Sequence, residues 1–172
     1  MFFQYKQMLA FQWRLNRFRF LVWSVALVFV TVVTASAFTG LYQSDAERQA
    51  AAETMKNPAM IAMIGPGYGV DNYTNGAMMA HEMFLFTAMV FAIMSILFVS
   101  KHTRAEEEDG RNEWLRSLPV GRLAPLTATV ILVSALNIIV GVLIGGSLSV
   151  ANIEGIPVEG SILYGVSLAV TG

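Results

Sequence analysis

The sequence predicts an all-α integral membrane protein, because of its composition and the way its apolar residues are grouped. The chain has 172 residues, of which 55% are hydrophobic and only 13% are charged, whereas about 25% of the residues of a soluble domain are charged. Its mean hydropathy is +0.57. Three uncharged runs are long enough to cross a bilayer core of about 30 Å as helices; they lie at residues 20–42, 83–100 and 123–150.

Residues 1–19 precede the first run and combine aromatic side chains with four cations, Lys6, Arg14, Arg17 and Arg19. Cations and aromatics directly before a span are typical of a helix that lies among lipid headgroups. A basic flank that only sets the topology has the same composition. We expect residues 1–19 to form a cytoplasmic, interfacial N-terminal helix.

Residues 20–42 carry no charge and form the predicted first transmembrane helix. Within them, Ala35-Ser36-Ala37 resembles the A-x-A site at which signal peptides are cleaved. The segment before this site is long and aromatic, and the apolar run continues past it. We therefore expect the run to stay in the protein as a span.

Residues 43–82 form the predicted extracytoplasmic loop, which has five acidic and two basic residues. Ser44 followed by Glu47 makes a capping box, which predicts a short helix over residues 44–56. An apolar stretch after Pro58 then leads into the turn sequence GPGYG.

The second and third transmembrane helices are predicted at residues 83–100 and 123–150. The third run is longer than a span requires, so we expect it to tilt or to protrude. Asn137 lies near its middle and is a candidate for the substrate path or for an interhelical hydrogen bond. Gly141 and Gly145 have the G-x-x-x-G spacing that lets two helices approach closely, so they share these two interpretations.

The last part of the chain is a short turn followed by an apolar segment. Residues 151–159 form the predicted extracytoplasmic turn, and residues 160–172 are apolar but too short to cross a bilayer. We expect residues 160–172 to be the start of a fourth transmembrane helix, in a chain that is truncated or incomplete. A re-entrant segment is the other interpretation.

Residues 101–122 form a polar segment between the second and third spans, with five basic and five acidic residues. Thr103 and Glu106 make a capping box, and the helix that starts there must end before Pro119. Near its end, three large apolar side chains are spaced to lie on one face. The residues expected to bind a soluble partner are Glu106, Glu107, Glu108, Arg111, Trp114, Leu115 and Leu118.

The distribution of cations predicts the orientation. Residues 1–19 carry four and residues 101–122 carry five, whereas residues 43–82 carry two and residues 151–159 none. Lys and Arg concentrate in the cytoplasmic loops of membrane proteins. We therefore expect a multi-pass protein of a bacterial plasma membrane, with its N-terminus and its polar segment in the cytoplasm.

Two stretches of the chain resemble a known family. The run HTRAEEEDGRNEWLRSLPVGR at residues 102–122 resembles the first cytoplasmic loop of ABC-type exporter permeases, in the group described as exporters of polyketide antibiotics. The run NPAMIAMIGPGYGVD at residues 57–71 resembles an outer-loop segment of the same group. The resemblance covers nearly the whole chain, with both motifs in the correct order around matching spans. The chain departs from the family in length, since members commonly have many more spans or work as paired permeases.

The resemblance implies a transmembrane permease subunit that exports a hydrophobic or amphipathic compound, such as an antibiotic, a drug or a lipid-like molecule. Residues 101–122 would then hold the coupling helix that docks on a separate ABC ATP-binding subunit, present in two copies. Membrane lipids and a second permease half would be further partners. The chain has no P-loop sequence G-x-x-x-x-G-K-[ST], so we expect ATP and Mg²⁺ on the partner subunit and no cofactor on this chain.

Composition argues against several other classes of protein. The absence of cysteine excludes disulfides and thiolate metal sites. The two histidines, His81 and His102, lie at opposite ends of one apolar run and are too far apart to share a metal ion. No basic stripe interleaved with aromatics follows the N-terminal segment, so we expect no nucleic-acid partner. We see no set of catalytic residues, and we expect the chain not to be an enzyme.

Two alternative functions stay open. Gly67-Tyr68-Gly69 lies between two spans, where a pore-loop cation channel has its filter, but Gly65-Pro66 replace the Thr-Val that should precede it. An ion-coupled secondary transporter usually keeps ionisable groups at mid-membrane depth. The three predicted spans have none between their ends.

Overall fold

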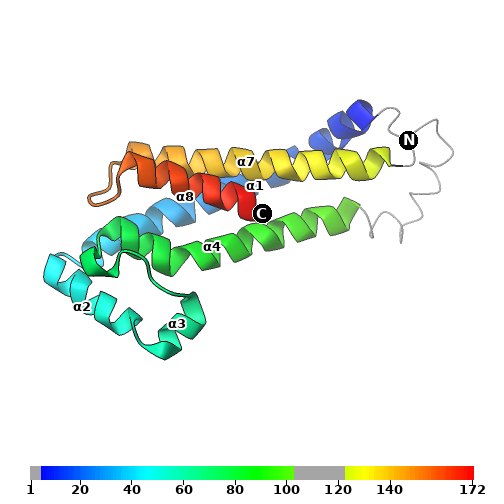
Figure 1. The fold of residues 1–172 in the computed structure, drawn as a ribbon. Helices are drawn as coiled ribbons and strands as arrows, with labels where there is room; N and C mark the ends of the chain where they lie inside the picture. Colours follow the sequence, from blue (N-terminus) through cyan, green and yellow to red (C-terminus); the bar gives the residue numbers. More distant parts are fainter. Residues whose placement is uncertain (1–4, 103–122) are drawn as a thin grey trace.

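The computed structural model describes residues 5–102 and 123–172, and its long helices run side by side (Figure 1). These helices are α1 (Tyr5–Leu41), α4 (Asn75–Ser100) and α7 (Ala124–Ala151), and the shorter α8 (Val158–Thr171) packs along α7. The described residues contain no strand. By length and composition, α1, α4 and α7 can each cross a membrane. The predicted all-α membrane fold is therefore confirmed.

Helix α1 is continuous and includes most of the segment that we expected as a separate interfacial helix. It has 37 residues, or roughly 55 Å, and no break occurs between residues 19 and 20. No Gly or Pro occurs from Tyr5 to Thr39, and only such a local feature would interrupt the helix. The change from charged to apolar residues alters the surroundings of the helix but leaves its backbone hydrogen bonds intact. Because the helix is longer than the bilayer core is thick, its ends project beyond that core.

The loop between the first two spans, residues 43–74, folds into α2 (Asp45–Met55), α3 (Pro58–Ile64) and the 3₁₀ turn η1 (Val70–Asn72). The capping box expected before α2 is confirmed: Glu47 N–H donates to Ser44 Oγ at 3.3 Å, and Ser44 N–H donates to Glu47 Oε2 at 3.3 Å. Helix α3 was not predicted. Asn57 caps it, and Pro58 occupies its first turn, where a missing N–H costs no hydrogen bond.

Helix α4 begins eight residues before the predicted span at residue 83. Thr74 caps it by accepting from Ala77 N–H at 3.3 Å. The uncharged run located the part of the helix able to lie in lipid, whereas the helix itself continues outward through Glu82 and His81 to its cap. Helices α7 and α8 lie close to their predicted positions. The turn between them contains Asn152 and Gly155, both with positive φ.

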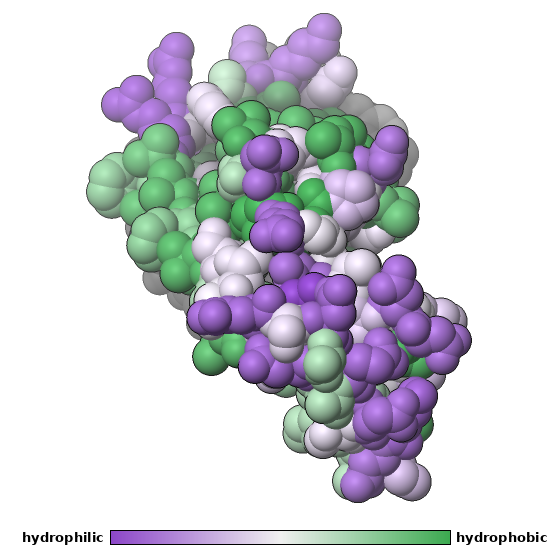
Figure 2. All heavy atoms as spheres, turned by 90° about the vertical axis from the view of Figure 1, so that its left-hand side faces the viewer, coloured by the Kyte–Doolittle hydropathy of each residue, from purple (hydrophilic) through white to green (hydrophobic). Residues whose placement is uncertain are grey.

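The surface follows the same division into apolar helices and polar ends. Figure 2 looks onto the end of the bundle that carries α2 and shows hydrophilic residues gathered over the part of the molecule nearest the viewer. Large apolar side chains, by contrast, are exposed along all the long helices, for example Phe29 on α1, Ile96 on α4 and Val142 on α7. A surface of this kind is suited to lipid or to further helices.

Candidate functional site

The predicted partner-binding surface and the predicted helix cap Thr103 lie outside the described residues. The surface residues concerned are Glu106, Glu107, Glu108, Arg111, Trp114, Leu115 and Leu118. The structure does place the two points at which their segment joins the bundle, after His102 and before Leu123. Both lie at the end of the bundle where α1 begins, opposite to α2 and α3 (Figure 1).

Asn137 forms a buried polar contact between two spans. Its side chain is 3% exposed, and its Nδ2 donates to Ser95 Oγ of α4 at 3.0 Å. The pair lines a cavity of about 550 Å³ between α4, α7 and α8, whose other walls are mostly valine, isoleucine and alanine. Asn137 therefore makes an interhelical hydrogen bond and also faces a cavity. The structure is compatible with both interpretations of this residue.

Gly141 and Gly145 form the contact between α7 and α8. A Cβ atom on Gly141 would lie 2.4 Å from the carbonyl oxygen of Gly165, and one on Gly145 would lie 3.0 Å from that of Ser161. The contact is reciprocal, since a Cβ atom added to Gly165 would lie 2.3 Å from the carbonyl oxygen of Gly141. The sequence alone could not show that Gly165, on another helix, completes the contact.

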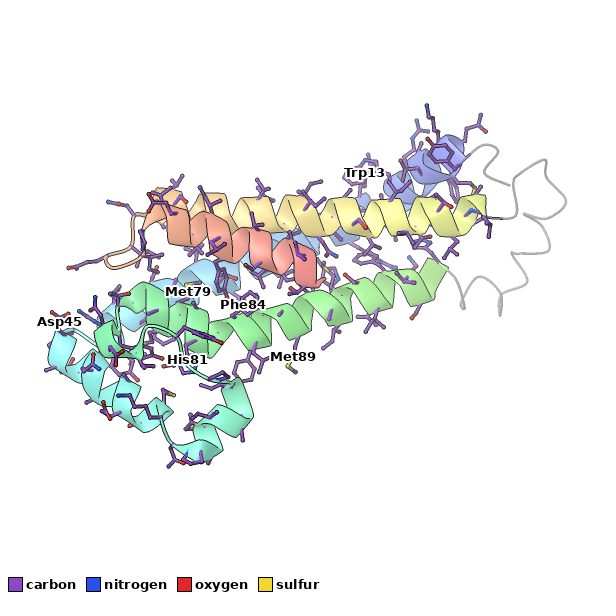
Figure 3. All side chains as sticks on the ribbon, viewed as in Figure 1. Trp13, Asp45, Met79, His81, Phe84 and Met89 are labelled. Carbon is purple, nitrogen blue, oxygen red and sulfur yellow. The ribbon has the colours of Figure 1, made fainter. Side chains whose placement is uncertain are left out.

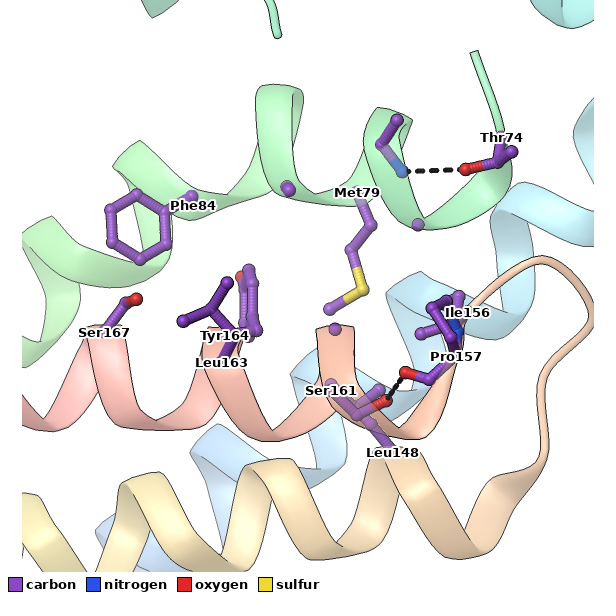
Figure 4. Close-up of a pocket in the computed structure, with 14 residues that line it drawn as sticks. Thr74, Met79, Phe84, Leu148, Ile156, Pro157, Ser161, Leu163, Tyr164 and Ser167 are labelled. Atoms are coloured by element: carbon purple, nitrogen blue, oxygen red, sulfur yellow. Dashed lines mark hydrogen bonds between the residues drawn. The ribbon is translucent and has the colours of Figure 1, made fainter. Parts of the chain in front are cut away.

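Two more cavities meet at Tyr164, which lies on α8. One, of about 450 Å³, lies between the outer parts of α4 and α8 (Figure 4), and the other, of about 270 Å³, lies between α1 and α4. Tyr164 Oη donates to Thr87 Oγ1 at 3.1 Å, and its ring meets Phe84 edge-on at 5.8 Å. Met79 lines both cavities, and in Figure 4 its side chain extends from α4 toward α8. The walls are apolar with a few hydroxyl groups, which suits hydrophobic or amphipathic molecules.

The loop between α1 and α4 is held to α4 by a cluster around His81, which Figure 3 places near the loop-bearing end of α4. His81 Nδ1 lies 3.0 Å from Tyr73 Oη, and Nε2 lies 3.2 Å from the carbonyl oxygen of Gly65. Tyr73 Oη also donates to Glu82 Oε1 at 3.3 Å. Burial and the neighbouring Glu82 raise the pKa of the Tyr73 phenol, so it stays a neutral donor. Among the described residues, no group of three or more His, Cys, Asp and Glu side chains could hold a metal ion.

The Gly-Tyr-Gly sequence belongs to this loop and not to a pore lining. Tyr68 is 83% exposed, and the backbone of Gly67 packs on the His81 ring so closely that a Cβ would lie 2.6 Å from it. Gly69 adopts a left-handed conformation before η1. These three residues form an exposed turn, and the geometry lends no support to a cation filter.

A further buried polar cluster, missed by our sequence analysis, lies where α4 ends. It joins α1, α4 and α7, and its members are Gln12, Asn16, Lys101, His102 and Thr129. Gln12 and Asn16 are one helical turn apart and are uncharged residues among cations. This spacing was the sequence feature that could have indicated a shared contact with other helices. Their positions in the basic N-terminal segment made them look like part of a solvated flank.

We expect Asn137→Leu to act on the stability of the helix bundle and not on the expected substrate path. Interhelical hydrogen bonds in membranes contribute about 0.6 kcal/mol on average, and Ser95→Ala removes the same bond from its other side. Both variants should therefore lower the melting temperature of the purified protein slightly and alike. A change of substrate preference in Asn137→Leu alone would instead assign Asn137 to the substrate path.

Comparison with known proteins identifies the family. Residues 6–169 match the model of the C-terminal domain of the multidrug efflux system permease Rv1217c. The chain is 37% identical over 142 residues to the multidrug efflux system permease protein Rv1217c of Mycobacterium tuberculosis, a match that covers 83% of this chain and 25% of the relative. The chain thus spans about a quarter of the length of that relative. Because the family model matches nearly every residue, the chain belongs to the family of multidrug efflux permeases, which confirms its resemblance to exporter permeases.

Proposed function

We propose that this chain is part of the transmembrane permease of an ABC-type exporter, which moves a hydrophobic or amphipathic compound out of the cell. The observation that carries the proposal is the match of residues 6–169 to the efflux permease family. Three helices able to cross a membrane and apolar cavities between them support it. The relative Rv1217c is described as a multidrug efflux system permease protein, which agrees with a substrate recognised by apolar surfaces.

In the proposed complex, energy reaches the permease from a separate ATP-binding subunit. These 172 residues contain no P-loop sequence, and in the proposal ATP and Mg²⁺ are bound by that subunit. In the proposed complex, which holds two copies of the ATP-binding subunit, residues 101–122 dock on this subunit at the cytoplasmic side. The excess of cations in residues 1–19 and 101–122 supports this orientation. A second permease half and the surrounding lipids complete the transport path.

The test is transport by inside-out vesicles that contain the permease with its ATP-binding subunit. We expect the lipophilic dye Hoechst 33342 to accumulate when ATP is present, and not with a non-hydrolysable ATP analogue. A protonophore should leave ATP-driven uptake unchanged. Uptake driven by a proton gradient without ATP would instead show a secondary transporter. Potassium currents from the permease alone, without ATP, would show a channel.

A further inference from the structure

The polar cluster at the end of α4 is unusual because it is buried although it lies near the end of the bundle. Asn16 and Thr129 are 0% exposed, Gln12 is 1% exposed and His102 is 4% exposed. Buried polar groups of this kind are costly unless they are hydrogen-bonded. The five residues Gln12, Asn16, Lys101, His102 and Thr129 are called the polar joint below.

Within the joint, Asn16 is fixed by three partners. Its Nδ2 donates to the carbonyl oxygen of Gln12 at 2.9 Å, and its Oδ1 accepts from Lys101 Nζ at 3.1 Å. These two contacts set the orientation of the amide, because a carbonyl oxygen needs a donor and an ammonium group needs an acceptor. The second hydrogen of Nδ2 then points to His102 Nε2 at 2.8 Å. With the amide in this orientation, His102 Nε2 is the acceptor of this hydrogen.

The same turn of α1 also holds the start of α7. Gln12 Nε2 donates to Thr129 Oγ1 at 3.0 Å, and Thr129 Oγ1 donates to the carbonyl oxygen of Pro125 at 3.0 Å. Residues 103–122 follow His102 in the chain and precede Leu123, the residue before α7. One turn of α1, from Gln12 to Asn16, therefore contacts the bundle on both sides of that segment.

We propose that Asn16 and Gln12 are positioning residues that pass movement of residues 103–122 on to α1 and α7. The inference rests on the proposed function, in which an ATP-binding subunit pushes on this segment. A hydrogen-bonded joint of mostly buried side chains is stiff, since each of its polar groups would lose a partner if the helices separated. Movement of the ends of the segment must then carry the three helices with it.

The test uses Asn16→Leu and Gln12→Leu in the complete permease, reconstituted in liposomes with its ATP-binding subunit. We expect the ATP-binding subunit to co-purify as it does with the wild type, since the joint lies inside the bundle. Hoechst 33342 transported per ATP hydrolysed should fall about tenfold, within the usual range of coupling between sites. Ser24→Ala is the control, because the bond from Ser24 Oγ to the carbonyl oxygen of Phe20 lies within α1.

Replacement of His102 separates coupling from simple packing. His102→Gln keeps an acceptor for Asn16 Nδ2 and should retain most of the coupling, whereas His102→Leu removes the acceptor and should lose it. Unchanged dye transport per ATP in Asn16→Leu, or equal coupling in His102→Gln and His102→Leu, overturns the inference while the proposed function stands. A wild-type complex that transports without ATP overturns the proposed function, and the inference with it.

Discussion

Replacing both Trp114 and Leu118 by alanine is expected to abolish binding of the ATP-binding subunit while membrane insertion stays intact. The two side chains are one turn apart on the same face of a predicted helix that is otherwise charged. Large aromatic side chains at the centre of an interface typically contribute about 2–4 kcal/mol each, which corresponds to an affinity loss of about 30- to 1,000-fold. Co-purification of the ATP-binding subunit and stimulation of its ATPase are the two measurements.

The matched control for this double variant is Asn112→Ala. Asn112 is two residues before Trp114, so in the predicted helix we expect it on the side opposite to the apolar face. Unchanged co-purification and unchanged ATPase stimulation in the Trp114 and Leu118 variant would contradict the proposed docking surface. An engineered thiol at Asn112 tests the orientation directly, because the chain has no cysteine of its own. Labelling of that thiol from outside intact cells would place the segment on the wrong side of the membrane.

Gly141→Ala is expected to separate α7 from α8 and to destabilise the bundle. The added Cβ would lie 2.4 Å from the carbonyl oxygen of Gly165, which is backbone and cannot rotate away. Overpacking of this kind typically costs about 1–3 kcal/mol. The melting temperature of the purified protein in detergent should fall by several degrees, because about 2–4 °C accompanies each kcal/mol for a chain of this size.

Gly146→Ala is the matched control on the same helix. A Cβ at Gly146 would meet nothing within 4 Å, and alanine is favoured over glycine in a helix by about 1 kcal/mol. The Gly146→Ala protein should therefore melt at or above the wild-type temperature. Equal melting temperatures for Gly141→Ala and Gly146→Ala would show that the close approach of α7 and α8 does not contribute to stability.

Features that depend on neighbouring residues in the chain were predictable. The hydrophobic length of a span decides whether it can cross a bilayer, and Ser44 with Glu47 decides where α2 starts. Both follow from local hydrogen bonds and from transfer of side chains to lipid. The start of α4 at Asn75 was missed. An uncharged run shows where the lipid-facing part of a helix begins, and the helix itself begins earlier.

The sequence by itself determined the class of protein, the order of its spans and its resemblance to exporter permeases. Only the tertiary structure decided which helix faces meet: Gln12 and Asn16 are buried against α4 and α7, and Gly165 opposes Gly141. The physical reason is that a polar residue near the end of a span can satisfy its hydrogen bonds either with water or within a buried joint between helices. Likewise, a glycine on a helix permits close approach of another helix but does not determine which helix packs there. In both cases the outcome depends on which helix packs alongside, and that helix comes from a distant part of the chain.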